Sequence, residues 1–590
     1  MCRSEAPCSL TMRKMASIPA KSVPLGCLRS RSRRSYSSSA VTRISSRGCA
    51  RRGFPRPGGL CQDPPEEVRD ARIDPRRGLR LVVAVAGPDP AQLLHLQPPE
   101  GPVVTGAPEW SLFLGFGLYL LLMIVVGIVT VRYMRSLDDF VLGGRRLGPW
   151  VAAISERASG ESAWFLLGLP GAAYAVGFME FWSVIGIGFG IFFSWALVAY
   201  GLRRMSEETG ALTIPDFLES RFPGSARAVR VLATGIILFF YTIYVGAQLV
   251  GAGKILHATF GLDPGHGMLL GAAIVVVYTV LGGFLAVAWT DLFQGLLMAV
   301  VAVVLPVLGL MHLAGEGGFV SSLAVRGEDF LAMNAGKTGR AFVFGVMIGG
   351  LSWGFGYFGQ PHLLTRYMAF RRLKDIRFGS LIAMSWVLIA YWGAMFIGLT
   401  AVGVLGPDVA DPDQVMPLLA KALVPAWIAG IMISGAVAAM MSTADSQLMV
   451  ASSSLVEDLY VKIHRHGRPP ADPGRLVLLG RIAAAAIAAV ALWLAFANED
   501  LIYDMVAYAW SGLGSSFGPV ILLAIWWRGL TRGGVVAGMV VGMASTILWK
   551  NVAALQDFVD LKAASFVLAL AAALLVSGLG IGARVIRSDK

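Results

Sequence analysis

The feature that most constrains this chain is a series of apolar segments, most of them about 20 residues long, that begins near Trp110. A helix needs roughly 20 apolar residues to cross a bilayer. Only 15% of the residues are charged, whereas soluble domains contain roughly 25%. Backbone groups in lipid must be satisfied within the protein, so repeated apolar segments indicate a helical bundle. The sequence therefore predicts an all-α polytopic membrane protein.

Thirteen such segments are predicted between residues 109 and 590, the membrane domain. Their approximate bounds are 111–131, 149–174, 178–202, 228–254, 267–284, 287–313, 341–362, 378–405, 425–454, 476–497, 501–527, 533–550 and 564–584. Lys and Arg gather in alternate loops and after the last segment, and the loops between them carry few. Positive residues collect on the cytoplasmic side of a membrane. The alternation predicts thirteen spans, with the N-terminus outside and the C-terminus inside.

Residues 1–108 have a different composition, rich in Arg, Ser, Pro and Gly, with 18 Lys and Arg against 8 Asp and Glu. Such a segment buries too little apolar surface to fold. We expect a disordered basic extension, or a mis-annotated one with the true start near Val103. A disordered tail offers no folded basic surface, so nucleic acid is not an expected partner. All five cysteines lie here, which leaves the membrane domain without thiol chemistry.

The ninth segment changes character halfway along. Its second half carries a dense set of oxygen-bearing side chains: Ser442, Thr443, Asp445, Ser446 and Gln447. Such groups are costly in a bilayer unless they face protein, water or a bound ion. One or two hydroxyls would indicate hydrogen bonding between packed helices. The density of the set and its acid favour a cation path, with the hard oxygen ligands that Na⁺ prefers.

Two segments are interrupted. The second has a polar, glycine-bearing middle at Ser155–Ser162, and the seventh surrounds Trp353 and Tyr357 with five glycines. Interrupted helices in matching places of two halves indicate a transporter binding site. Five segments separate their starting points, which favours a five-plus-five inverted repeat. Aromatic residues one turn apart can also be ordinary packing, but the glycines favour a pocket for a small solute.

Several stretches match a known family: GLPGAAY, YTVLGGFLAVAWTD, WGFGYFGQPHLLTRYMA, MSTADSQLMVASSSLVEDLY and YAWSGLGSSFGPV. Through them, the chain from about Trp110 to Arg584 resembles the sodium/solute symporter family, and most closely its bacterial proline carriers. The resemblance implies a leucine-transporter-like core with broken helices. It also implies sodium-coupled import of L-proline across the cytoplasmic membrane by alternating access, with Na⁺ as the coupling ion and no enzymatic activity.

The resemblance also implies roles for individual residues. The positions that match the family's sodium site are Ala158, Glu161, Ala439, Ser442 and Thr443. The positions that match its substrate site, or lie beside it, are Trp164, Tyr244, Trp353, Tyr357, Gln360 and Pro361. A role in the ion path or in coupling is expected for Arg157, Asp291 and Asp445.

The chain departs from the family's pattern at one point of the sodium site. The proline carriers have an aspartate followed by methionine, where this chain has Gly160 and Glu161. On a regular helix the shift of one residue turns the carboxylate by about 100°. Arg157 lies four residues before Glu161, a spacing that allows an ion pair. The guanidinium could therefore stand in for the cation, or Glu161 could carry a proton.

Three alternatives to sodium-coupled proline import remain open from the sequence. One is a symporter of another small amino acid or a carboxylate, coupled to sodium or to protons. A membrane sensor built on a transporter fold would need a signalling domain, and the sequence beyond Arg584 is short. An enzyme would need clustered catalytic groups, but the seven histidines are scattered. The oligomeric state is left undetermined.

Overall fold

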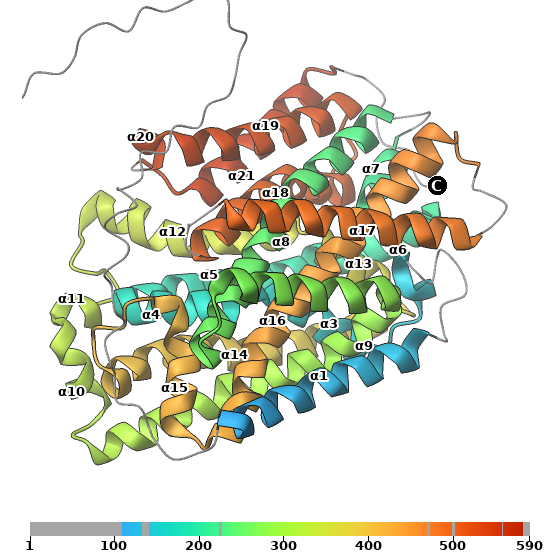
Figure 1. Ribbon diagram of the computed structural model, residues 1–590. Helices are drawn as coiled ribbons and strands as arrows, with labels where there is room; N and C mark the ends of the chain where they lie inside the picture. Colours follow the sequence, from blue (N-terminus) through green and yellow to red (C-terminus); the bar gives the residue numbers. More distant parts are fainter. Residues whose placement is uncertain are drawn as a thin grey trace, which may run out of the picture. The chain divides into compact units, whose positions relative to one another are not determined.

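The computed structural model describes residues 109–131, 141–222, 227–468, 473–497, 502–556 and 558–581. The regular structure in these ranges is helical (Figure 1), apart from isolated bridge residues such as the paired Leu147 and Phe370. The all-α class predicted from the sequence is confirmed. The basic extension predicted for residues 1–108 lies outside the described residues.

The helices of the first half are α1 (Glu109–Val131), α3 (Pro149–Ala163), α4 (Leu169–Val176), α5 (Phe181–Ser194), α6 (Tyr200–Thr209), α7 (Ile214–Ser220), α8 (Arg227–Phe260) and α9 (Pro264–Gly315). Next come α10 (Phe319–Leu323), α11 (Glu328–Leu331), α12 (Ile348–Leu351), the 3₁₀ segment η8 (Ser352–Phe358), α13 (Pro361–Met368) and α14 (Asp375–Leu405). The remaining elements are α15 (Val415–Leu423), α16 (Ala426–Ser453), η10 (Ser454–His464), α17 (Pro473–Phe496), α18 (Ile502–Trp526), α19 (Arg532–Asn551), α20 (Ala553–Gln556) and α21 (Leu561–Gly578).

Eleven helical stretches in the described ranges are long and apolar enough to cross a membrane. One of them, Pro149–Thr209, has 61 residues, far more than the roughly 20 that one span requires. Gly177 interrupts it with a φ of 69°, so this stretch contains the predicted second and third spans. The predicted fifth and sixth spans lie in α9, which is broken at Gly283 with a φ of 60°. All thirteen predicted segments are therefore helical, and the fifth, Pro264–Val277, is short.

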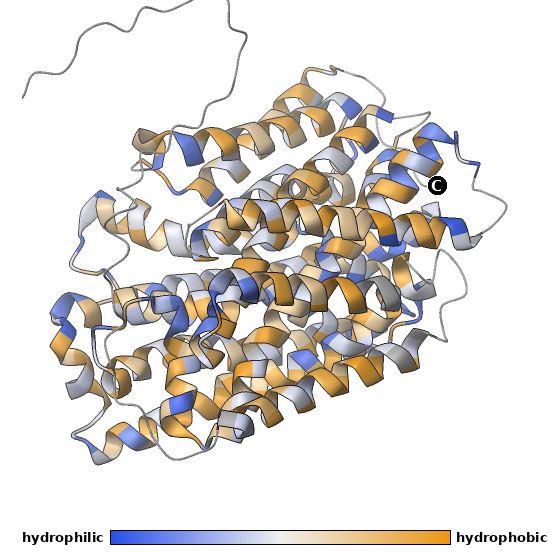
Figure 2. Cartoon of the chain, viewed as in Figure 1, coloured by the Kyte–Doolittle hydropathy of each residue, from blue (hydrophilic) through white to orange (hydrophobic). Residues whose placement is uncertain are grey.

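The centre of the bundle is α16, which packs against α1, α3, α8, α9 and α17. Its residues from Met432 to Ser453 are all buried. Large apolar side chains are exposed on outer helices, among them Leu381 and Trp493. Figure 2 shows apolar residues along the helices and hydrophilic residues gathered toward their ends and connections. This distribution suits a protein whose surroundings are lipid.

Glycines allow the interrupted seventh segment to lie directly against α5. A Cβ added at Gly190 would stand 2.3 Å from Cα of Gly354 in η8, and one added at Gly186 would stand 2.5 Å from Cα of Leu351. Both distances are shorter than any real contact, so only residues without a side chain fit there. The glycines that suggested a pocket in the sequence thus also set the position of η8.

Both predicted helix interruptions are confirmed. In α3, Ser162 has a φ of 55° and a ψ of −178°. In the seventh segment, η8 ends at Phe358, Gln360 is extended, and Pro361 starts α13. Proline suits the first position of a helix because its missing N–H would have no partner there. The two breaks give the protein non-helical backbone inside the bundle, which proteins retain where it serves a site.

Candidate functional site

The break in α3 is held open by side chains of neighbouring helices. The N–H of Ser162 donates to Oγ1 of Thr443 at 2.9 Å. The N–H of Ala163 donates to Oε1 of Gln248 at 2.7 Å. A positive φ is unusual for a residue other than glycine and persists only where the surroundings enforce it. The strained backbone at Ser162 is therefore stabilised from α16 and α8.

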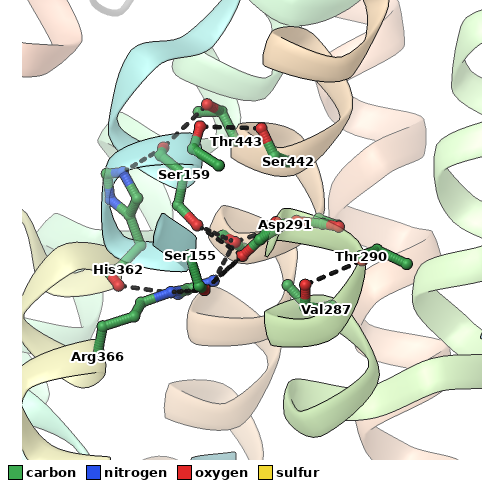
Figure 3. A network of polar contacts seen from close by, with 12 residues as sticks. Ser155, Ser159, Val287, Thr290, Asp291, His362, Arg366, Ser442 and Thr443 are labelled. Atoms are coloured by element: carbon green, nitrogen blue, oxygen red, sulfur yellow. Dashed lines mark hydrogen bonds and ion pairs between the residues drawn. The ribbon is translucent and has the colours of Figure 1, made fainter. Parts of the chain in front are cut away.

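Hydroxyl oxygens of α16 meet carbonyl oxygens of α3 just before this break. Oγ of Ser442 donates to the carbonyls of Ala158 at 2.9 Å and Ala439 at 3.1 Å. Oγ1 of Thr443 donates to the carbonyl of Ser159 at 2.9 Å. All five residues are buried, and Figure 3 shows Ser442 and Thr443 beside Ser159. Hydroxyl and carbonyl groups are hard, neutral oxygen donors, a set that fits Na⁺.

Four of the five predicted sodium positions thus lie together, and the fifth has other partners. Nη1 of Arg157 donates to Oε1 of Glu161 at 3.4 Å, and the hydroxyl of Tyr391 donates to Oε2. The same Arg157 forms a two-pronged ion pair with Glu156, with Nε 2.6 Å from Oε2. These charged side chains have an exposed fraction of 0%. The Glu161 carboxylate is therefore oriented by α3 and α14 rather than by α16.

A small cavity lies beside the break. It is lined by Gly160, Glu161, Ser162, Trp164, Ile187, Tyr244, Trp353, Tyr357, Val506 and Trp510. The ring centroids of Trp164 and Trp353 are 4.9 Å apart, and those of Tyr357 and Trp510 are 4.7 Å apart in a T-shaped arrangement. Aromatic walls with a few polar groups are typical of small-molecule sites.

Four of the six residues predicted for the substrate site line this cavity: Trp164, Tyr244, Trp353 and Tyr357. The other two lie in the turn that follows η8. Nε2 of Gln360 donates to the carbonyl of Trp510 at 3.0 Å, and Pro361 is buried at the start of α13. Through these contacts the turn is fixed to α18, which supplies part of the cavity wall.

Three cavity residues were not predicted from the sequence: Ile187, Val506 and Trp510. For Trp510 a signal existed, because small residues surround it in the stretch YAWSGLGSSFG and indicate close helix approach. A Cβ at Gly356 would stand 1.7 Å from Nε1 of Trp510, so the indole occupies the space that the glycine leaves. Ile187 and Val506 are apolar residues in apolar helices, and nothing in the sequence distinguishes them.

Asp291 of α9 lies in a polar network that adjoins the oxygens predicted to bind sodium (Figure 3). Its Oδ2 accepts hydrogen bonds from Ser155 at 2.6 Å, Ser159 at 3.0 Å and Arg366 at 3.2 Å. Ser159 connects the two clusters, because its carbonyl accepts from Thr443 while its hydroxyl donates to Asp291. A shift in the ion-binding oxygens would therefore be felt at this ion pair.

Asp445 joins the same network from α16. Its Oδ1 accepts a hydrogen bond from Oγ of Ser446 at 3.0 Å. Ser446 in turn contacts the guanidinium of Arg366 and lies 3.0 Å from Oγ of Ser159. The network thus connects α3, α9, α13 and α16, the helices that surround the predicted ion path.

Comparisons with known proteins agree with this geometry. The chain is 40% identical over 440 residues to the high-affinity proline transporter PutP of Bacillus subtilis, covering 74% of this chain and 91% of that protein. It is 38% identical over 444 residues to the sodium/proline symporter of Escherichia coli K12, covering 74% and 87%. A Na⁺-coupled sialic acid symporter, solved in a substrate-bound outward-open state, has a similar fold, with a TM-score of 0.68 at 20% identity over 81% of this chain and 99% of that one.

The family comparison covers the region that contains both interrupted segments and the cavity. A model of the sodium:solute symporter family matches residues 140–542. This range is more than half of the 590 residues of the chain. The chain belongs to the sodium:solute symporter family.

Proposed function

We propose that this protein imports L-proline across the cytoplasmic membrane by sodium-coupled symport with alternating access. Family membership makes it a multi-pass sodium-coupled transporter rather than an enzyme. The names of the two proline-transporting relatives, which match along most of their length, support proline as the substrate.

One observation carries the mechanism: the ion-binding oxygens and the solute cavity share the same break in α3. The carbonyls of Ala158 and Ser159 meet the α16 hydroxyls, and the next residues, Gly160 to Ser162, line the cavity. Na⁺ held by these oxygens would fix the wall against which the solute binds. Because coupling is a free energy shared by two sites, Na⁺ should tighten proline binding and proline should tighten Na⁺ binding equally.

Charged clusters at the two ends of the bundle suit alternating access. On the proposed cytoplasmic side, Arg230 of α8 forms ion pairs with Asp216 and Glu219 of α7 and with Asp458 of η10. On the proposed outer side, Lys254 pairs with Asp413 at 2.7 Å. Each cluster joins helices that must separate if the cavity is to open at that end.

Uptake of radiolabelled L-proline into proteoliposomes tests the proposal. An imposed inward Na⁺ gradient should drive accumulation, and unlabelled proline should compete better than other amino acids or small carboxylates. A proton gradient without Na⁺ should drive none. Uptake driven by protons alone would overturn sodium as the coupling ion, and stronger competition by another solute would overturn proline as the substrate.

A further inference from the structure

The solute cavity contains a carboxylate that its neighbours do not fully neutralise. Glu161 is the acidic residue among those that line the cavity. Its cationic neighbour is Arg157, but that guanidinium already meets Glu156 through two nitrogens, with Nε at 2.6 Å. The contact from Arg157 to Glu161 is single and longer, at 3.4 Å. Two carboxylates therefore share one guanidinium.

This arrangement is unfavourable for an empty cavity. The three side chains are fully buried, and a buried charge is costly unless an opposite charge and hydrogen bonds accompany it. With one cation between two carboxylates, the group carries a net negative charge. Either a proton or a cation that arrives with the solute would remove it.

The carboxylate of this cavity-lining residue is also held in a fixed position. The hydroxyl of Tyr391 donates to Oε2 of Glu161, and the hydroxyls of Tyr391 and Tyr357 are 2.8 Å apart. Tyr357 is itself a cavity wall, as are Trp164 and Trp353. Aromatic faces around a carboxylate are a favourable setting for an organic ammonium, because ring faces attract cations.

We propose that Glu161 recognises the positively charged nitrogen of the solute, and so selects ammonium-bearing zwitterions over anions of the same shape. The inference rests on the proposed proline transport. It adds that the Glu161 carboxylate binds the ring nitrogen of proline. In the family pattern this position is a methionine, so the selectivity would be a property of this chain's own residue.

The test compares L-proline with tetrahydro-2-furoate, which replaces the ring NH₂⁺ by oxygen and keeps the ring and carboxylate. Binding is measured on detergent-purified protein by thermal stabilisation in saturating Na⁺, so that a variant unable to transport still gives an answer. In the wild type we expect proline to bind about 30-fold more tightly than tetrahydro-2-furoate, which corresponds to the free energy of one hydrogen bond between charged groups. Glu161→Gln should reduce this ratio to about 3-fold by weakening proline binding.

Two variants separate recognition from structural damage. Glu161→Asp keeps the charge and should retain most of the preference for proline. Glu156→Gln lies outside the cavity lining but leaves Arg157 to neutralise Glu161 alone, so it should also lower the ratio by weakening proline binding, while the analogue still binds. A wild-type ratio in Glu161→Gln would overturn the inference alone. A wild type that binds neither proline nor its analogue would overturn the proposed substrate and the inference with it.

Discussion

The proposed role of Ser442 and Thr443 depends on the backbone carbonyls that their hydroxyls contact. The sequence places two hydroxyls and an acid in the middle of a span, which indicates a polar path. Their partners are the carbonyls of Ala158 and Ser159, and each pair is separated by 284 positions in the chain. Backbone carbonyls exist in every residue, so side-chain pattern alone identifies neither; Ala158 was predicted only through the family resemblance, and Ser159 was not predicted.

For Glu161 the sequence shows that a carboxylate is present in the break, but it does not show which partners the carboxylate contacts. A Cβ added at Gly160 would stand 3.2 Å from Cδ2 of Leu363 and 3.8 Å from Nη2 of Arg157. A side chain at position 160 would therefore press on Leu363, which would have to shift by a few tenths of an ångström. The acid one position later turns to Arg157 and Tyr391 instead.

At this scale we predict that Ser442→Ala and Thr443→Ala each raise the Na⁺ concentration for half-maximal proline uptake about tenfold, because each removes one ion-binding oxygen. The measurement is the Na⁺ dependence of initial uptake rates in proteoliposomes. Ser434→Ala is the matched control, since its buried hydroxyl donates only within α16, to the carbonyl of Gly430. Unchanged Na⁺ dependence in both test variants would contradict the sodium site.

At the scale of elements, the interrupted helices could be predicted because breaks need special residues. Polar and glycine residues at Ser155–Ser162 and the five glycines near Trp353 are visible in the sequence. The break of α9 at Gly283 lies beside the predicted boundary between the fifth and sixth spans, so this boundary also agrees with the sequence. The contact between α5 and η8 also depends on particular glycines meeting each other, which only packing reveals.

Two glycines of α5 give a matched prediction. A Cβ at Gly186 would stand 2.6 Å from the carbonyl oxygen of Gly350, whereas one at Gly188 would meet nothing within 4 Å. Gly186→Ala should therefore destabilise the protein by about 1–3 kcal/mol and lower proline uptake, because backbone cannot move aside as a side chain can. Gly188→Ala should behave as the wild type. Thermal denaturation in detergent and uptake assays check both, and equal stability of the two variants would contradict the packing.

At the scale of the whole molecule, the loop charges predict a topology that the helices alone leave undetermined. Exposed Asp408 follows α14 and should lie outside, while exposed His466 follows η10 and should lie in the cytoplasm. We expect this orientation because short loops rich in Lys and Arg are retained on the cytoplasmic side.

Cysteine labelling of the full chain in intact cells tests this orientation. With the five natural cysteines changed to serine, an impermeant maleimide should label Asp408→Cys directly and His466→Cys only after permeabilisation. The reverse labelling pattern would show that the membrane domain is inserted the other way.

The sequence by itself determined the all-α class, the thirteen apolar segments and both interrupted helices, and it predicted most of the residues of the cavity and of the proposed ion site, since each depends on composition or on residue types that bilayers and breaks require. The tertiary structure decided which atoms meet. It placed the α3 carbonyls on α16, brought Trp510 into the space beside Gly356, and turned the Glu161 carboxylate to Arg157 and Tyr391. Most of these contacts join residues far apart in the chain, and they depend on packing that local pattern does not encode.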